Sequence, residues 1–235
     1  MKILETQYLY FFLLLFTISY PLAQSFEKRI QLYKKFKFIG FAIISILVVF
    51  IPWDMYFTEK GIWWFNTNYT TGVRLYNLPI EEVLFFIIVP FACVFIYEVL
   101  NYFIKTDIFS KIARPFLMTL SISLVLSSVI FNQQMYTLVC FLTTGISILI
   151  ACVINPNWLG RFLLAYLVSL IPLLLINGIL TGSLIETPVV NYNPNEIIGF
   201  RIVTIPIEDF IYNLLMFLLL IGVYEKSSSF YQLRS

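Results

Sequence analysis

Long apolar segments fill most of this 235-residue chain. Crossing the hydrocarbon core of a bilayer takes about 20 mostly apolar residues, and seven segments come close to that length. They are residues 7–24, 37–53, 80–103, 115–131, 134–153, 161–179 and 206–223. Only 12% of the residues are charged, against about 25% in a soluble domain. The sequence therefore predicts an all-α integral membrane protein with seven transmembrane helices.

The loops between these segments differ in positive charge, which predicts the orientation. Lysine and arginine concentrate in the cytoplasmic loops of membrane proteins. One set of alternating loops and ends holds Lys28, Arg29, Lys34, Lys35, Lys37, Lys105, Lys111, Arg114, Arg161, Lys226 and Arg234. The other set holds Lys2, Lys60, Arg74 and Arg201. We therefore expect an outside N-terminus and a cytoplasmic C-terminus in the inner (cytoplasmic) membrane of the cell. Residues 7–24 lack a basic leader beyond Lys2, so we interpret them as a helix rather than a signal peptide.

The chain contains no histidine, and this excludes several kinds of site at once. Histidine-ligated haem, most zinc sites and Ser-His-Asp triads all need that side chain. The cysteines Cys93, Cys140 and Cys152 lie in apolar segments, where a thiol is typically a small buried hydrophobe. The net charge of +2, with no basic stripe, argues against nucleic acid. We expect no cofactor and no metal, and chemistry carried by carboxylates, hydroxyls, amides and aromatic rings.

One segment of the chain is repeated without gaps. GVRLYNLPIEEVLFF, from Gly72, matches GFRIVTIPIEDFIYN, from Gly199, at an offset of 199 − 72 = 127 residues. At the same offset Tyr97-Glu98 matches Tyr224-Glu225. Extending the offset backward pairs the first two apolar segments with the fifth and sixth, and leaves the fourth as a connector. The predicted divisions are a first repeat over 1–104, a connector over 105–133 and a second repeat over 134–235. An odd number of spans between corresponding helices gives both halves the same orientation, so we predict parallel repeats around a pseudo-two-fold axis.

Each repeat carries two adjacent acids just after a proline expected at the first helical position. Acids in a first turn can simply complement the helix dipole. At the mouth of a transmembrane helix, however, ionisable groups are costly and usually functional. We therefore interpret Glu81, Glu82, Glu208 and Asp209 as catalytic. Four acids in a shared site would titrate at different pH values and supply both an acid and a base.

Within each pair, neighbouring side chains point about 100° apart, so one acid is enough to face a shared cavity. Glu81 shares a helix face with Phe85, and Glu208 shares one with Tyr212, at i,i+4 spacing. We favour Glu81 and Glu208 as the inward members.

Other polar and aromatic residues fall on the same predicted outer side. Asp54 is expected to end the second apolar helix. Trp63 and Trp64 have an equally good interpretation as an interfacial aromatic belt, and Asn177 as a bridge between helices. The Tyr97-Glu98 and Tyr224-Glu225 pairs lie about 25 Å away along their helices and are interpreted as structural. The candidate substrate-binding residues are Asp54, Trp63, Trp64, Arg74, Phe85, Asn177, Tyr192, Arg201 and Tyr212.

The sequence resembles the membrane-integral lycopene cyclases of the heterodimer type. The motifs that carry the resemblance are IPWD, GIWWFN, TTG and LPIEEVLFF…FIYE, then NGILTG, VVNYN and GFRIVTIPIEDFIYN. They cover nearly the whole chain, which looks like two such subunits fused. The resemblance implies an isomerase, lycopene β-cyclase, that converts lycopene to γ-carotene and then β-carotene. It also implies that the four acids of the two pairs are essential, without assigning which is acid and which is base.

The implied reaction is a redox-neutral cyclisation. An acid protonates C2 of the terminal double bond, the C5–C6 double bond attacks the cation at C1, and a base removes the proton from C6. Faces of Trp63, Trp64, Phe85 and Tyr212 could stabilise the cation. The implied partners are lycopene within the bilayer and other enzymes of the carotenoid pathway. The alternative interpretation is a small polytopic transporter or proton-coupled channel, which would also use membrane carboxylates. A retinal protein would need a lysine in the last apolar segment, which has none.

Overall fold

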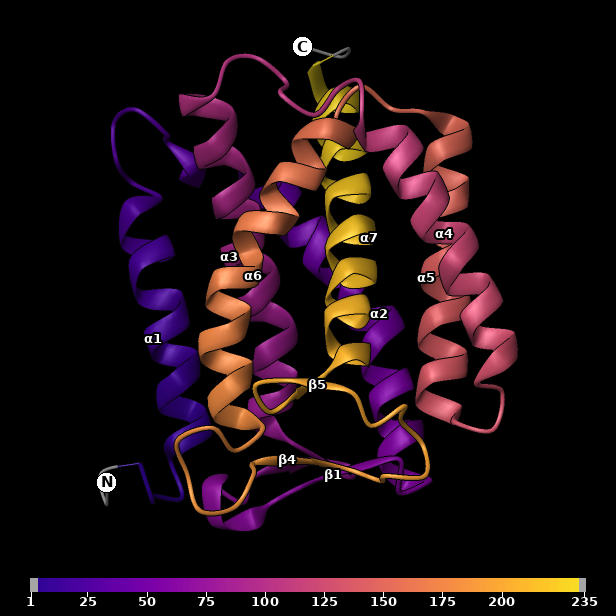
Figure 1. The fold of residues 1–235 in the computed structure, drawn as a ribbon. Helices are drawn as coiled ribbons and strands as arrows, with labels where there is room; N and C mark the ends of the chain where they lie inside the picture. Colours follow the sequence, from indigo (N-terminus) through magenta and orange to yellow (C-terminus); the bar gives the residue numbers. More distant parts are fainter. Residues whose placement is uncertain (1–3, 233–235) are drawn as a thin grey trace.

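The computed structural model describes the backbone of residues 4–232 (Figure 1). Seven α-helices lie within that range, so the predicted all-helical fold is confirmed. They are α1 (Leu9–Gln24), α2 (Phe36–Glu59), α3 (Ile80–Phe103), α4 (Ala113–Ile130), α5 (Met135–Ile154), α6 (Leu159–Leu180) and α7 (Ile207–Gln232). Two short 3-10 helices, η1 (Leu32–Lys35) and η2 (Thr67–Tyr69), lie in the loops.

By length and composition, six of the described helices, α2 to α7, can cross a membrane. The apolar helix α1 has 16 residues and is shorter than these. The chain therefore has the helices of a multi-pass membrane protein, while the seventh span, the orientation and the repeat boundaries stay predictions. Two basic residues in the charge count, Lys2 and Arg234, lie outside the described residues.

Helix α2 is longer than its apolar segment, and the prediction that Asp54 ends it is wrong. The helix continues through Pro52 to Glu59. An apolar count marks only the part of a helix that lies in hydrocarbon, and a helix can continue into the polar layer because its backbone hydrogen bonds are internal. The added turns carry Asp54 to the inner face of α2, where it is 3% exposed.

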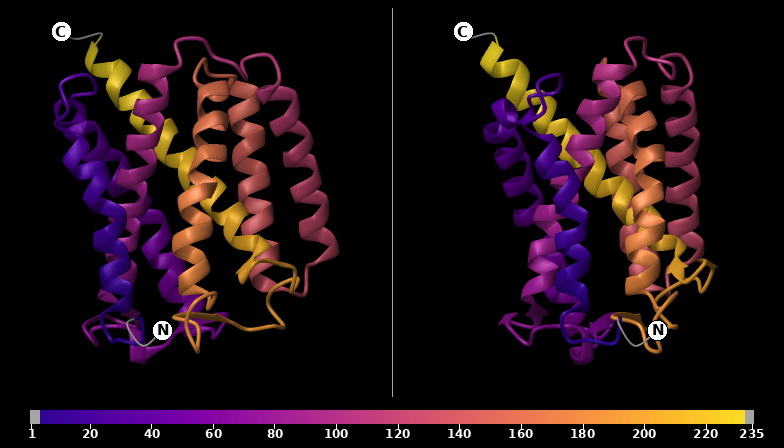
Figure 2. Two further views of the ribbon diagram at one scale, coloured as in Figure 1. Left: turned by 60° about the vertical axis from the view of Figure 1, so that its left-hand side comes forward. Right: turned by 90° about the vertical axis from the view of Figure 1, so that its left-hand side faces the viewer.

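Helices from the first and second parts of the chain pack on each other. Helix α1 packs on α3 and α5 packs on α7. Helix α2 packs on both α7 and α3, and α6 packs on α3 and to a smaller extent on α7. Figure 2 shows α7 running obliquely through the bundle. Phe50, Phe86, Phe162 and Phe217 are almost fully buried in the resulting core. Helix α4 packs on α5 at one side of the bundle.

Short strands join the two long loops at the end that holds the N-terminus (Figure 1). Strand β1 (Trp63–Phe65) pairs antiparallel with β4 (Val190–Tyr192), and Trp64 lies opposite Asn191. Residues 64 and 191 are related by the 127-residue offset, so exchanging the two segments leaves the pairing unchanged. Strands β2 (Arg74–Leu75) and β3 (Leu78–Pro79) form a hairpin directly before α3. Strands β5 (Arg201–Ile202) and β6 (Ile205–Pro206) form the corresponding hairpin before α7.

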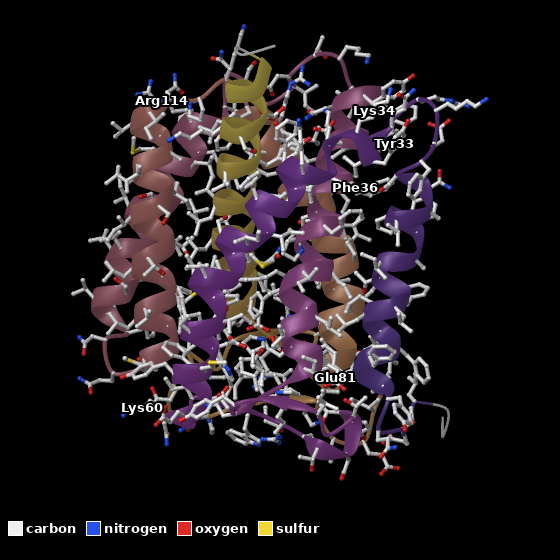
Figure 3. The ribbon with its side chains drawn as sticks, turned by 180° about the vertical axis from the view of Figure 1, so that it is seen from behind. Tyr33, Lys34, Phe36, Lys60, Glu81 and Arg114 are labelled. Atoms are coloured by element: carbon white, nitrogen blue, oxygen red, sulfur yellow. The ribbon has the colours of Figure 1, made fainter. Side chains whose placement is uncertain are left out.

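The opposite end of the bundle holds a reciprocal pair of hydrogen bonds. The Tyr97 hydroxyl donates to Glu225 at 2.6 Å, and the Tyr224 hydroxyl donates to Glu98 at 2.5 Å. Lys35 Nζ lies 2.6 Å from the second oxygen of Glu98. These contacts tie α3 to α7, as the structural interpretation of the two Tyr-Glu pairs expects. Figure 3 shows Lys34 and Arg114 at this end and Glu81 and Lys60 at the other.

Candidate active site

The two hairpins fix the start of α3 and α7 in the same way. Pro79 and Pro206 each immediately precede a helix, one residue earlier than predicted. The turns of both hairpins carry a residue with positive φ at the equivalent position, Tyr76 and Val203. Each helix therefore presents its acidic pair with the same backbone geometry, directly after a tight hairpin.

Glu81 and Glu208 anchor the two long loops to these helices. The Glu81 carboxylate accepts a hydrogen bond from the backbone N–H of Thr71 at 2.6 Å. Glu208 accepts one from the backbone N–H of Ile198 at 2.8 Å and another from the Thr137 hydroxyl at 2.6 Å. Both carboxylates are fully buried. One oxygen of each carboxylate therefore holds loop backbone, while their catalytic assignment stays a prediction.

The other member of each pair faces the cavity. Glu82 and Asp209 line a pocket at the end of the bundle that holds β1 and β4 (Figure 1), with an empty volume of about 600 Å³ that includes space open to solvent. Glu81 and Glu208 do not line the pocket, so the prediction that they point inward is wrong. Phe85, the residue on which the prediction for Glu81 rested, is also an i+3 neighbour of Glu82. Positions three and four apart share a helix face, so one aromatic residue does not distinguish adjacent acids.

Asp209 is held by three hydrogen-bond donors. The Tyr136 hydroxyl donates to Oδ1 at 2.9 Å, and the Tyr192 hydroxyl donates to Oδ2 at 2.7 Å. Asn177 Nδ2 adds a third bond to Oδ2 at 3.2 Å. An ionised carboxylate acts as acceptor only, so this set of donors suits the charged form of Asp209.

Glu82 and Asp54 are held more loosely. Glu82 accepts one hydrogen bond, from the Tyr10 hydroxyl at 2.6 Å. Asp54 accepts a long one from the Tyr212 hydroxyl at 3.4 Å, and within the described part of the chain its other oxygen has no partner. Both carboxyl groups line the pocket within electrostatic range of Asp209. The pocket thus holds one carboxyl group rich in donors and two that are poor in them.

Aromatic rings form much of the pocket wall. The Trp63 ring lies edge-on to Tyr136 at 5.0 Å and to Tyr212 at 6.3 Å, measured between centroids. Tyr136 stacks on Tyr192 at 6.0 Å. A cation in this space would face several π-systems, which attract positive charge.

Tyr192 lines the pocket from strand β4, in the second long loop. Burial, together with the Asp209 carboxylate beside it, raises the pKa of the Tyr192 phenol well above its ordinary value. The phenol therefore keeps its proton and remains a donor to Asp209. On its other side the Arg201 guanidinium lies 5.7 Å from the ring centroid.

The candidate binding residues divide into two groups. Asp54, Trp63, Phe85, Asn177, Tyr192 and Tyr212 all line the pocket. The remaining candidates, Trp64, Arg74 and Arg201, are exposed. Trp64 is on the strand face opposite to that of Trp63 because successive side chains of a strand alternate. Of the exposed three, Arg201 contacts the site through the ring of Tyr192.

Sequence reasoning missed Tyr10, Tyr136 and Asn213, which also line the pocket. Their common feature is a polar side chain on an otherwise apolar helix. The repeat contains a signal for two of them, because the offset places Tyr10 opposite Thr137, next to Tyr136. Extending the repeat residue by residue into the first helix would have drawn attention to both tyrosines.

Comparison with known proteins places these motifs in a family. The sequence model of the lycopene cyclase family matches residues 7–100 and 133–227, which together make up more than half of the chain. A bifunctional lycopene cyclase/phytoene synthase of Pyrenophora tritici-repentis is 32% identical over 80 residues, 34% of this chain and 13% of that protein. Proteins of the same description from Aspergillus oryzae and Podospora anserina are 40% identical over 63 residues and 34% identical over 88 residues.

These alignments are short compared with the full lengths of the relatives. They cover 27% of this chain and 11% of the Aspergillus protein, and 37% of this chain and 14% of the Podospora protein. No solved structure gives a significant match.

Proposed function

The chain belongs to the lycopene cyclase family, and from that premise we propose that it is a lycopene β-cyclase. It closes β-ionone rings at the linear ends of lycopene, giving γ-carotene and then β-carotene, and acts as an isomerase. The observation that carries the proposal is the pocket faced by Glu82 from the first half and Asp209 from the second. A cyclisation that takes up one proton and releases another needs an acid and a base on the same substrate end.

Glu82 is the acid in this proposal. Its carboxyl group receives one donor, from Tyr10, and is free to carry the reacting proton. Transfer of that proton to C2 forms a C–H bond and leaves a tertiary cation at C1. Asp54, beside it in the pocket, adds a second weakly held carboxyl group that can return a proton to Glu82.

Asp209 is the base. The π-electrons of the C5–C6 double bond form the C1–C6 bond and move the cation to C5. Asp209 then takes the proton from C6, and the electrons of that C–H bond restore the C5–C6 double bond. The overall change is isomerisation with no net proton or electron. The donors from Tyr136, Tyr192 and Asn177 keep Asp209 ionised and oriented until this last step.

The pocket wall protects the cation. Rings of Trp63, Tyr136 and Tyr212 surround the space where positive charge moves from C1 to C5. The paired strands β1 and β4 cover the outer end, and Trp63 is 4% exposed. Excluding water from this space prevents capture of the cation as an alcohol.

The proposal includes a topology and a setting. Two parallel repeats, over 1–104 and 134–235, face each other around a pseudo-two-fold axis, with α4 in the connector over 105–133. The N-terminus is outside and the C-terminus cytoplasmic, in the inner membrane of the cell. The substrate is a carotenoid dissolved in the bilayer. The fungal relatives are named for two activities in one protein, which supports contact between this chain and another enzyme of the carotenoid pathway.

The test is expression in bacteria that accumulate lycopene, followed by chromatography of the pigment. We expect γ-carotene and β-carotene from the wild-type chain, and mostly unconverted lycopene from an Asp209→Asn control expressed at the same level. Lycopene alone from well-inserted wild-type protein would reject the cyclase. Ion-coupled flux in liposomes, with added carotenoid unchanged, would instead favour a transporter that uses the same carboxylates.

A further inference from the structure

A second cavity continues from the reaction pocket into the bundle. Its empty volume of about 430 Å³ includes space open to the surroundings, and it shares Phe85, Leu173, Asn177 and Asn213 with the pocket. Along α3 its wall runs from Phe85 to Ile96, which is about 16 Å at 1.5 Å per residue. The cavity therefore leads from the acids at the outer end toward the middle of the apolar bundle.

The side chains of this second cavity leave room and present little polarity. Ala92 and Cys93 on α3 and Ser169 on α6 are small, and Pro172 interrupts the hydrogen bonding of α6 beside them. The Ser169 hydroxyl donates to the Tyr166 carbonyl at 2.7 Å, which satisfies its proton within the helix. Apart from the amides Asn177 and Asn213, where the cavity meets the reaction pocket, a passage lined in this way is mostly apolar and suits a hydrocarbon chain.

The side of the passage is not sealed. Val89, Ala92, Ile96 and Pro172 are half-buried, so the wall between α3 and α6 is partly open to the surroundings of the bundle. Helix α1 contributes Thr17, whose hydroxyl donates to the Leu13 carbonyl at 2.8 Å. A molecule dissolved in the bilayer can reach the acids through this side without crossing the polar outer loops.

The equivalent space in the other half is filled. At the 127-residue offset, Asn177 corresponds to Phe50, Asn213 to Phe86 and Cys93 to Leu220. Phe50 stacks on Phe86 at 5.8 Å and meets Tyr212 edge-on at 5.1 Å between ring centroids. Phe50 and Leu220 are fully buried. The two halves thus share the same arrangement of helices. The space between α3 and α6 is open, whereas the equivalent space between α7 and α2 is filled by side chains.

We propose that this passage, defined by Val89, Ala92, Cys93, Ser169 and Pro172, holds the polyene chain of the substrate while one end group occupies the reaction pocket. The proposal rests on the proposed function and adds the route and the order of events. Because one passage serves one set of acids, the two ends of lycopene are cyclised in separate binding events. The one-ringed carotenoid must leave, reverse and enter again before its second end reacts.

The test narrows the passage and compares two substrates. Ala92→Phe fills the passage, and Leu219→Phe makes a matched change at the equivalent position of α7. The substrates are lycopene and a truncated linear analogue, which carries the same end group on a chain too short to reach Ala92. We expect Ala92→Phe to slow lycopene conversion by about 10²-fold, the loss that displacing a reacting group by about 1 Å brings. The Ala92→Phe variant should convert the truncated analogue at the wild-type rate. The Leu219→Phe variant should convert lycopene and the analogue at the wild-type rate.

A binding measurement separates the two proposals. Binding is followed by the quenching of tryptophan fluorescence that we expect from added lycopene, and this quenching should weaken in Ala92→Phe whether or not the chain turns over. Equal lycopene conversion by wild type and Ala92→Phe, or equal losses on both substrates, would overturn the passage. Wild-type binding that depends on Ala92 without any conversion would reject the cyclase and retain the passage. If Ala92→Phe is not stably folded, Ser169→Leu narrows the passage from α6 and carries the same expectations.

Discussion

In the first half of the chain Glu82 accepts one hydrogen bond, from Tyr10, whereas its counterpart Asp209 accepts three, from Tyr136, Tyr192 and Asn177. The backbone around the two acids is nearly the same. Both helices follow a two-stranded hairpin in the same register, and both preceding acids hold the backbone ten residues earlier. The two halves therefore share the same backbone geometry at the helix starts. They differ in the groups that donate hydrogen bonds to Glu82 and to Asp209.

This difference fits the chemistry of the proposed reaction. A cyclisation by proton addition and proton loss needs one carboxyl group that gives a proton and one that accepts it. Two carboxyl groups in identical surroundings would compete for the same role. A duplicated helix start brings the acids together, and unequal donors then assign their roles. Each prediction below tests that inequality.

The largest effect should come from Asp209→Asn. The amide keeps the hydrogen-bonding shape but cannot accept the proton from C6, so we expect turnover to fall by about 10²–10⁴-fold. Protonation and ring closure by Glu82 remain possible, and the cation at C5 can then lose a proton from C4 or from the neighbouring methyl group. Residual product should contain rings with a displaced double bond, which chromatography with mass spectrometry and NMR detects. Residual product that is entirely β-ring would contradict the assignment of Asp209 as base.

Glu82→Gln should reduce turnover within the same range of about 10²–10⁴-fold, but with a different product pattern. Without its acid the site cannot form the first cation, so any residual product should keep the β-ring. Incorporation of deuterium at C2 in D₂O should fall together with total product. The matched control is Glu81→Gln, which alters the adjacent carboxyl group behind the pocket wall. If Glu81→Gln abolishes activity while Glu82→Gln is fully active, the two acids have the opposite roles.

Exchanging the two acids, by Glu82→Asp together with Asp209→Glu, should have an intermediate effect. Both positions remain carboxylic acids, but each reacting oxygen moves by roughly one methylene. A shift of about 1 Å in a catalytic group can cost about 10²-fold in rate. The β-ring should remain the product, because the donors around each position still assign the roles. A change of ring type in the double variant would show that side-chain length, rather than surroundings, separates acid from base. Turnover is measured in membranes with equal amounts of inserted protein.

Much of this arrangement was predictable from sequence, and the reasons for the failures are physical. The apolar segments located all seven described helices, and the gapless repeat brought the acidic pairs to equivalent helix starts. Hydropathy could not predict that α2 continues through Pro52 to Glu59. It reports which side chains prefer hydrocarbon, and the helix is held by backbone hydrogen bonds that do not depend on this preference. It consequently gave Asp54 a place at a helix end instead of on the pocket wall.

The choice within each acidic pair depended on contacts that spacing does not encode. Glu81 faces away from the pocket because the Thr71 N–H, in the loop before α3, occupies its carboxylate. That bond depends on how the loop turns back over the helix start. Trp64 is a similar case, since only the pairing of β1 with β4 decides which tryptophan points inward. Tertiary contacts of loops therefore set the details of the site, while helix patterning sets its location.

Removing one donor at a time should give smaller losses. Tyr192→Phe takes away one of the three donors to Asp209 and leaves the ring stacked on Tyr136. A hydrogen bond to a charged group contributes about 1.5–3 kcal/mol, so we expect a loss of at least about tenfold in turnover. Tyr10→Phe, which removes the donor to Glu82, should affect a protonated acid less. Turnover of the two variants at equal expression checks this order, and a larger loss for Tyr10→Phe would reverse the assignment.

The smallest effect on turnover is expected at the far end of the same helices, where the two halves contact each other reciprocally. Tyr97→Phe and Tyr224→Phe each remove one hydrogen bond between α3 and α7 without touching the pocket. The two losses should differ, because Glu98 keeps Lys35 as a partner when Tyr224 is replaced. In the described part of the chain Tyr97 is the side chain that donates to Glu225, so Tyr97→Phe leaves that carboxylate to water.

We expect Tyr97→Phe to lower the unfolding temperature in detergent by about 2–4 °C, for about 1 kcal/mol, and Tyr224→Phe to lower it less. Turnover should be unchanged in both variants. A loss of turnover without loss of stability would show that this end of α3 and α7 also positions the acids.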